Sequence, residues 1–246
     1  NPQQARTLLP YPVLGLVPNF RGSKLVVREN PSAPVSEAFR MLQANLRFLS
    51  ADRQLKVIVV ASSMAKEGKS TIAANLAAAT AQLGRRVLLI DADLRNPAQH
   101  KLWELPNEVG LSNVLGGEVE FSEAVAEAMP NLDVLTAGDL PSNPVALIDS
   151  SQMAVLIGNS SQNYDLVIVD TPPLTVAADA TVLGKMTDGM LMIVRPGVAD
   201  SGSVASAKEL LSQLNQTVLG LAINGTSKKG VSYYGTASTN SAIDRA

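Results

Sequence analysis

The residues with the clearest chemical potential are 61–71, a segment that ends in Gly68-Lys69-Ser70-Thr71. The segment follows a β-branched stretch and opens an alanine-rich stretch, so it joins a predicted strand to a predicted helix. A helix N-terminus leaves backbone N–H groups free and carries partial positive charge, which attracts phosphate. There Gly68 lets the backbone approach the phosphates, Lys69 can reach the β- and γ-oxygens, and Ser70 can bind Mg²⁺. The spacing predicts nucleoside triphosphate binding.

This loop departs from the general pattern at Ser63, which stands where a glycine is expected, five residues before Gly68. Gly-Lys-Ser tripeptides also occur by chance, and the alternative is an ordinary strand-to-helix turn with an exposed lysine. The flanking elements favour the phosphate loop, because a strand is predicted over 56–60 and a helix over 72–83.

Carboxylates follow two further apolar runs. Asp91 and Asp93 come directly after residues 86–90, and Asp170 comes directly after residues 165–169. Continuous apolar runs of this length are typical of central parallel strands buried on both faces. Ligands of open α/β sheets bind at the carboxyl ends of the strands. We therefore expect five side chains to converge on one place: Lys69, Ser70, Asp91, Asp93 and Asp170.

Such a set suits phosphoryl transfer, which depends mostly on positioning and charge neutralisation. Mg²⁺ takes a few oxygen ligands and keeps waters, so a serine with one or two carboxylates suits it. A further aspartate can accept the proton of an attacking hydroxyl. Aspartates at strand ends also form turns, but that explanation is unfavourable when the phosphate loop and the aspartates together follow three apolar strands, 56–60, 86–90 and 165–169.

In this order the chain resembles a known family. The phosphate loop is followed by hydrophobic-Asp-x-Asp-x-Arg at residues 89–95 and by hydrophobic-Asp-x-Pro-Pro at residues 169–173. The chain thus resembles, over residues 35–234, the bacterial protein-tyrosine kinases (BY-kinases) of polysaccharide export, which are relatives of MinD/ParA-type ATPases. The resemblance implies an α/β P-loop NTPase fold of the MinD/ParA-like type. It also implies an ATP-dependent autokinase that modifies tail tyrosines between subunits and regulates exopolysaccharide polymerisation and export.

The resemblance assigns roles to individual residues. The catalytic set is Lys69, Asp91, Asp93 and Arg95. Asp91 would be the base for the tyrosine hydroxyl. The ATP-binding set is Ala65, Lys66, Glu67, Gly68, Lys69, Ser70, Thr71 and Asn224, where Asn224 takes the place at which relatives contact adenine. The Mg²⁺ ligands, direct or through water, would be Ser70, Asp93 and Asp170.

The family also uses a Glu-x-x-Arg-x-x-Arg helix motif for subunit contact in a ring. Here Glu37 and Arg40 match, but Gln43 replaces the second arginine, and Arg47 lies one turn further on as a substitute. The departure puts ring assembly in question. The alternative is the solvated face of an amphipathic helix.

Three loop residues also differ from relatives. Lys66 stands where relatives usually have glycine, and Ala65 where they often have proline. Met64 stands five residues before Lys69, where MinD/ParA-type proteins carry a lysine. This argues against a straightforward partitioning ATPase, although a P-loop ATPase switch without kinase activity and a nucleotide-binding scaffold with little turnover remain alternatives.

Residues 226–246 lack an apolar period and are predicted to form a flexible tail. The tail contains Tyr233 and Tyr234, which match the tyrosine cluster that BY-kinases phosphorylate; the alternative is that they pack back on the domain. Phosphorylation adds negative charge, so we hypothesise that it weakens self-association. Tyr11 is a secondary candidate phosphosite, although packing is the alternative.

Composition sets further limits. The length of 246 residues predicts one α/β domain, and alternating strand and helix patterns predict a doubly wound, mostly parallel sheet. With the resemblance, this gives a kinase domain over 31–225 after an extended linker over 1–30. The absence of cysteine excludes an iron–sulfur reductase, and a net charge of −2 gives no basic patch for nucleic acid. No apolar run could span a bilayer. The resemblance therefore implies a cytoplasmic domain whose membrane-spanning co-polymerase region lies upstream or on a partner, with a cognate tyrosine phosphatase as a further partner. His100 and Trp103 are expected to be surface and packing residues.

Overall fold

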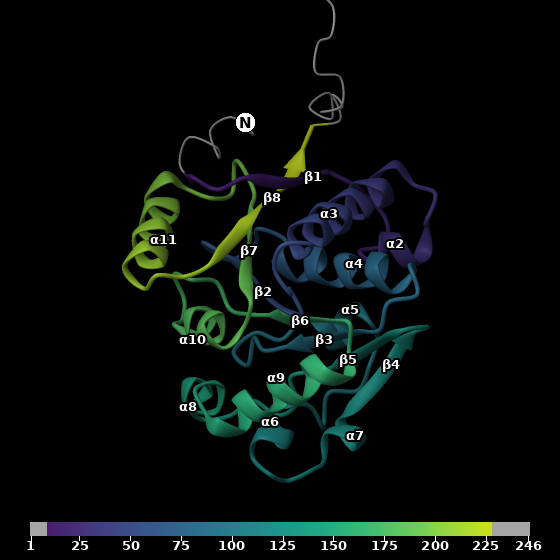
Figure 1. Ribbon diagram of the computed structural model, residues 1–246, viewed down its shortest axis with the longest axis vertical. Coiled ribbons are helices and arrows are strands. Elements are labelled where there is room, and N and C mark those ends of the chain that lie inside the picture. The colour runs from purple at the N-terminus through teal and green to yellow at the C-terminus, as the bar shows by residue number, and fades with distance from the viewer. Residues whose placement is uncertain (1–8, 228–246) are drawn as a thin grey trace, which may run out of the picture.

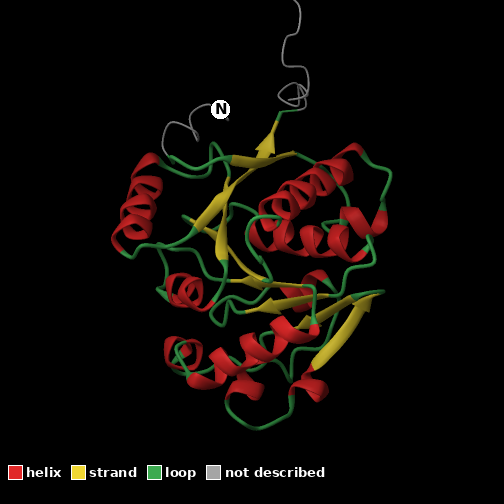
Figure 2. Cartoon of the chain, in the orientation of Figure 1, coloured by secondary structure: helices red, strands yellow, loops and turns green. Residues whose placement is uncertain are grey.

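The computed structural model describes residues 9–227, whose strands form one eight-stranded sheet in the order β1-β8-β7-β2-β6-β3-β5-β4 (Figures 1 and 2). The strands are β1 (Val13–Pro18), β2 (Val57–Ser62), β3 (Val87–Asp91), β4 (Val125–Met129), β5 (Leu132–Leu135), β6 (Leu166–Asp170), β7 (Gly189–Val194) and β8 (Val218–Thr226). Neighbouring strands are parallel except β4, which pairs antiparallel with β5. The carboxyl ends of the parallel strands therefore share one edge of the sheet.

Helices cover both faces of this sheet, as Figure 1 shows. The helices are α2 (Val26–Glu29), α3 (Pro34–Ser50), α4 (Lys69–Ala81), α5 (Gln99–Leu102), α6 (Leu111–Leu115), α7 (Phe121–Ala124), α8 (Pro144–Ile148), α9 (Ser151–Asn163), α10 (Asp179–Met186) and α11 (Ser201–Gln213). One layer contains α2, α3 and α4, and the other contains α9, α10 and α11. The predicted doubly wound, mostly parallel α/β fold is confirmed. Within residues 9–227, no helix is long and apolar enough to cross a bilayer.

The core consists of two apolar layers, one on each face of the sheet. Strands β2, β3, β6 and β7 are buried along their whole length, as their continuous apolar runs predict. Helix α4 is buried almost throughout, and its many alanines let it lie between α3 and the sheet. Burial of these runs fixes the strands whose ends carry the polar residues described below.

Several boundaries and elements differ from the patterns in the sequence. Helix α4 begins at Lys69, three residues before the predicted start, because Gly68 takes the left-handed conformation that ends the loop. The antiparallel strand β4 and helix α10 are not signalled by apolar periodicity. The short strand expected at residues 13–18, inside the extended linker segment, is confirmed as β1, which pairs in parallel with β8 and forms an edge of the sheet. The apolar run 218–223 continues in β8 to Thr226.

The close pairing of β1 with β8 leads to a testable prediction at Gly220. A Cβ atom there would lie 2.6 Å from both Leu14 Cγ and the Pro12 carbonyl oxygen. We expect Gly220→Ala to displace β1 and lower the free energy of unfolding by about 1–3 kcal/mol. Gly158→Ala is the matched control, because its Cβ meets no atom within 4 Å on helix α9, and it should raise stability by about 0.5–1 kcal/mol. Urea denaturation measures both, and a Gly220→Ala protein as stable as wild type would contradict the prediction.

Candidate active site

The loop between β2 and α4 is closed by contacts that admit only glycine at position 68. Gly68 has φ 85° and ψ 18°, the left-handed region that a side chain disfavours. A Cβ atom there would lie 2.2 Å from Asn224 Nδ2, which donates a hydrogen bond to the Glu67 carbonyl oxygen (2.8 Å). Asn224, in β8, therefore lies directly against the loop where α4 begins.

A buried carboxylate, that of Glu67, holds the loop from inside. One oxygen accepts hydrogen bonds from Ser63 Oγ (2.9 Å) and the Met64 N–H (3.0 Å). The other accepts from the Arg195 N–H (3.0 Å), directly after β7. Burial raises the pKa of Glu67, while these hydrogen bonds act in the opposite direction. Ser63, the departure from the glycine pattern, thus supplies a hydrogen bond that a glycine could not.

Lys66, the second departure, has φ 67°. A non-glycine residue in this region carries a strain of about 1–2 kcal/mol, which a glycine would avoid. Its side chain is exposed. The loop of this chain therefore keeps the backbone shape without the glycine.

A buried ion pair joins the loop to the neighbouring strand. The Lys69 ammonium contacts Asp170 Oδ1 at the end of β6 and lies 3.3 Å from Ser70 Oγ. The other Asp170 oxygen accepts a hydrogen bond from Gln99 Nε2 (2.9 Å), which also donates to the Ser70 carbonyl oxygen (3.0 Å). Trp103 is buried and donates through Nε1 to Gln99 Oε1 (3.2 Å). No pattern in the sequence indicates Gln99, yet this side chain connects Ser70 with Asp170.

Asp91 lies beside this pair, since it is opposite Asp170 in the parallel register of β3 and β6. Its carboxylate is fully buried and accepts hydrogen bonds from the N–H groups of Ala98 (2.9 Å), Gln99 (2.9 Å) and Asp93 (3.1 Å). Burial, followed by the nearby Asp170 carboxylate, raises the pKa of Asp91 to about 7. A carboxyl group that titrates near neutrality can accept or release a proton under ordinary conditions.

Asp93 belongs to the same cluster and is buried, with 6% of its surface exposed. Its Oδ1 accepts hydrogen bonds from the N–H groups of Asn96 (3.0 Å) and Arg95 (3.3 Å), and burial raises its pKa. These bonds form a tight turn that fixes the direction of the carboxylate after β3.

Arg95 is directed towards Asp179, a residue that the sequence patterns did not single out. The Arg95 Nη2 atom lies 3.5 Å from Asp179 Oδ1, and Asp179 is fully buried at the start of α10. Neither oxygen of Asp179 has a hydrogen-bond partner within residues 9–227, and burial raises its pKa. This ion pair links the loop after β3 to α10.

The five side chains expected to converge therefore lie together at the carboxyl ends of β2, β3 and β6. Within the described part of the chain, no three His, Cys, Asp or Glu side chains gather closely enough to hold a metal ion by themselves. An ion here would need other oxygens, such as those of phosphate and water, beside one or two carboxylates and Ser70.

Other predicted residues lie elsewhere. Glu37 and Arg40 are on α3 and pair with each other (Arg40 Nε to Glu37 Oε2, 2.8 Å), while Gln43 is buried. Tyr11 is half-buried and packs against the core. His100 is partly buried in α5. Tyr233 and Tyr234 lie outside the described residues.

The raised pKa of Asp91 predicts a pH-dependent stability difference. Because the folded pKa of about 7 exceeds the ordinary value of 3.8, the folded protein binds more protons than the unfolded chain between these limits. The contribution of Asp91 to stability is therefore present at low pH and is lost as pH rises towards 7. Relative to wild type, Asp91→Asn should gain up to a few kcal/mol between about pH 4.5 and 7.5. Urea denaturation with EDTA measures this, and a difference that stays constant with pH would contradict it.

The role of Glu67 predicts a specific loss of stability. In Glu67→Gln, an amide NH₂ group replaces an oxygen that accepts backbone or serine protons, so a donor faces a donor. We expect the free energy of unfolding to fall by about 1–3 kcal/mol. Glu123→Gln on α7 makes the same change at an exposed position and should alter stability by less than about 0.5 kcal/mol. Equal effects of the two substitutions would show that the buried contacts of Glu67 are unimportant.

Comparison with known proteins places this geometry in a family. Residues 55–218 match the family described as AAA domain. The chain is 41% identical over 220 residues to tyrosine-protein kinase YwqD of Bacillus subtilis, covering 87% of this chain and 93% of that protein. It is 33% identical over 207 residues to tyrosine-protein kinase etk of Escherichia coli K12, covering 84% of this chain but 28% of that longer protein.

Solved structures agree. The kinase domain of Escherichia coli ETK has a TM-score of 0.86 and 29% identity, covering 97% of this chain and 99% of that one. MinD of Aquifex aeolicus, with a TM-score of 0.54 and 26% identity over 68% of this chain and 67% of its own, shares the fold. The fold is thus that of P-loop NTPases of the MinD/ParA-like type. The chain belongs to the bacterial tyrosine-protein kinase family, whose catalytic domain it contains.

Proposed function

We propose that this tyrosine kinase uses Mg²⁺ and ATP to phosphorylate Tyr233 and Tyr234 on a second copy of the chain. The observation that carries the proposal is that the Lys69–Asp170 ion pair lies beside the buried Asp91, whose pKa is raised to about 7. Together these groups provide a cation for phosphate, oxygen ligands for a metal ion, and a proton acceptor.

The phosphates of ATP fit the loop that Gly68 closes. The α4 N-terminus attracts their charge, and Lys69, the first residue of α4, would hold the β- and γ-phosphates. The remaining loop residues, Ala65, Lys66, Glu67 and Thr71, would surround them, with Asn224 on the β8 side. Ser70, Asp170 and Asp93 would hold Mg²⁺, which neutralises developing phosphate charge. The small number of carboxylates fits an ion that retains water ligands.

Transfer would form a bond between the tyrosine oxygen and the γ-phosphorus as the bond to the β-bridging oxygen breaks, releasing ADP. Asp91 would take the phenolic proton. In the structure its carboxylate is enclosed by backbone N–H groups of residues 93–99, so proton transfer requires this segment to open towards the acceptor. Arg95, held near Asp179, would be released or repositioned by the same movement.

The end of β8 supports tail tyrosines as acceptors. Strand β8 ends at Thr226, close to Asn224, which contacts the loop. Residues 225–233 span at most about 30 Å when fully extended, which sets an upper limit on how far Tyr233 can lie from the end of β8. The exposed Glu37–Arg40 pair on α3 would contribute to the contact between copies.

We further propose that this reaction regulates exopolysaccharide polymerisation and export from the cytoplasmic side of a membrane. The support is similarity to Etk, of which this chain matches only 28%, so that relative contains further regions. A membrane-spanning co-polymerase region, on this polypeptide or on a partner, would connect the kinase to export, and a tyrosine phosphatase would reverse the modification.

Mixing two complementary variants tests the transfer between copies. Lys69→Met retains the tyrosines without the phosphate-binding lysine, and Tyr233→Phe/Tyr234→Phe retains the site without the acceptors. Each variant alone with Mg²⁺ and ATP should gain no tail phosphate. In the mixture, tandem mass spectrometry should find phosphate on Tyr233 or Tyr234 of the Lys69→Met chain.

Three results would count against the proposal. Phosphate on wild type but not in the mixture would indicate transfer within one copy. Phosphate at other tyrosines alone would exclude the tail. Released inorganic phosphate without any phosphotyrosine would indicate an ATPase that switches between states.

A further inference from the structure

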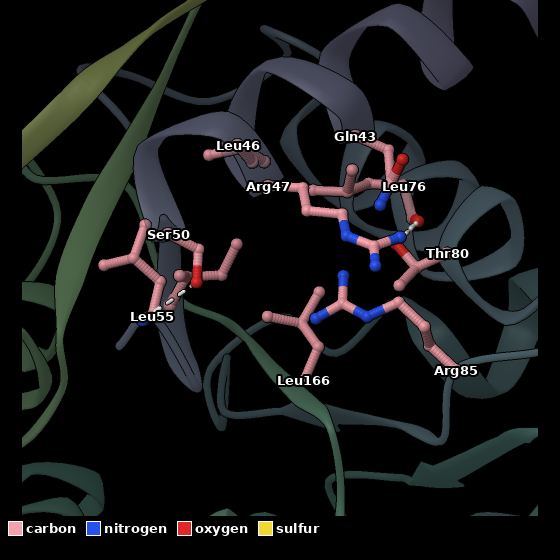
Figure 3. Close-up of a pocket in the computed structure, with 10 residues that line it drawn as sticks. Gln43, Leu46, Arg47, Ser50, Leu55, Leu76, Thr80, Arg85 and Leu166 are labelled. Carbon is pink, nitrogen blue, oxygen red and sulfur yellow. Dashed lines mark hydrogen bonds between the residues drawn. The ribbon is translucent and has the colours of Figure 1, made fainter. Parts of the chain in front are cut away.

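A pocket lies at the opposite ends of the strands from the nucleotide loop. It lies beneath the C-terminal half of α3, and Leu55, just before β2, and Leu166, at the start of β6, line it. Figure 3 shows leucine side chains and several polar side chains around the pocket. No residue that we place in the kinase reaction lines this pocket.

Two arginines dominate its charge. Arg47 comes from the last turn of α3 and Arg85 from the segment between α4 and β3, and Figure 3 shows their guanidinium groups facing one another. Within residues 9–227, neither side chain has an ion pair or a hydrogen bond. Burial, followed by the charge of Arg47, lowers the pKa of Arg85. Asp165 acts in the opposite direction on Arg85, but no carboxylate lines the pocket.

The pocket also contains a hydrogen-bond donor that has no partner within residues 9–227, the amide of Gln43. Gln43 lines the pocket with only 4% of its surface exposed, and its Nε2 has no hydrogen-bond partner among the described residues. A buried amide N–H without a partner is costly, so it implies an acceptor that enters the pocket. The Ser50 hydroxyl accepts from the Leu55 N–H (3.3 Å), which leaves its own proton free to donate.

The ordinary explanation for arginines here is the partial negative charge at helix C-termini, since Arg47 lies in the last turn of α3 and Arg85 follows α4. That attraction accounts for one cation at each helix end. It does not account for two guanidinium groups that face each other, nor for the unpaired amide of Gln43 in the same pocket.

We propose that this pocket binds a phosphate group, held by Arg47, Arg85 and Gln43. A tetrahedral phosphate presents oxygens on several sides and can accept from two opposed arginine forks at once, whereas a planar carboxylate presents one bidentate edge. The phosphate has two possible sources, an inorganic ion in solution and a phosphorylated tyrosine of the tail. The tail source rests on the proposed function; the inorganic source does not.

The test follows the Nε–Hε NMR signals of Arg47 and Arg85 in the full-length protein, saturated with Mg·ADP so that the nucleotide loop is filled. One titration uses inorganic phosphate, and another uses a peptide of residues 227–240 phosphorylated on Tyr233, beside the unphosphorylated peptide. We expect saturable shifts of both signals with at least one of the phosphate-bearing ligands. Arg47→Gln and Arg85→Gln should each weaken binding about ten-fold or more, because each removes a charge-assisted hydrogen bond.

Arg53→Gln is the control, since it removes the same charge at an exposed position that does not line the pocket. It should bind as wild type does. A response to inorganic phosphate supports the pocket even if no tail tyrosine is ever phosphorylated, and a response to the phosphopeptide alone identifies the tail as the source. The proposal is overturned if neither ligand shifts the two signals, or if Arg53→Gln weakens binding as much as Arg47→Gln and Arg85→Gln.

Discussion

The structure of the site depends on the ion pair between Lys69 and Asp170. The pair joins the first residue of α4 to the last residue of β6 in an interior that excludes most water. Breaking a buried ion pair by removing one partner typically costs about 3–5 kcal/mol, because the remaining charge is left uncompensated. The pair is possible only because β2 and β6 are parallel neighbours, so that the loop after β2 and the end of β6 meet. Gln99 then satisfies the second Asp170 oxygen.

Around this pair the site holds more negative than positive charge. Asp91, Asp93 and Asp170 lie together, while Lys69 is in direct contact with Asp170. Their burial and mutual repulsion raise the pKa of Asp91, and burial raises that of Asp93. A divalent cation would relieve this repulsion, and the phosphates that accompany it would draw on the Lys69 charge. The unfavourable charge balance of the site thus suits the Mg²⁺ and ATP that we propose as its ligands.

Apolar patterns located the strands because a central parallel strand must be apolar on both faces. This is why Asp91 and Asp170 could be placed at one sheet edge before the structure was known. The patterns did not reveal the contacts between distant residues that hold the site together. Gln99 lies in a single-turn helix, and its contacts with Ser70 and Asp170 span 29 and 71 positions of the chain. Asp179 contacts Arg95 across the fold, and Glu67 binds the backbone after β7. No local pattern encodes such contacts. The edge strands β1 and β4 are short or irregularly patterned, so their pairing also depends on tertiary structure.

The central claim is that the carboxyl ends of β2, β3 and β6 form one nucleotide site around Lys69 and Asp170. A crystal structure with Mg²⁺ and a non-hydrolysable ATP analogue tests it most directly. We expect the β- and γ-phosphates to lie within hydrogen-bond distance of Lys69 Nζ and the N–H groups at the start of α4. The metal ion should lie beside Ser70 and Asp170, directly or through water. A nucleotide bound elsewhere, or phosphates that leave Lys69 paired only with Asp170, would contradict it.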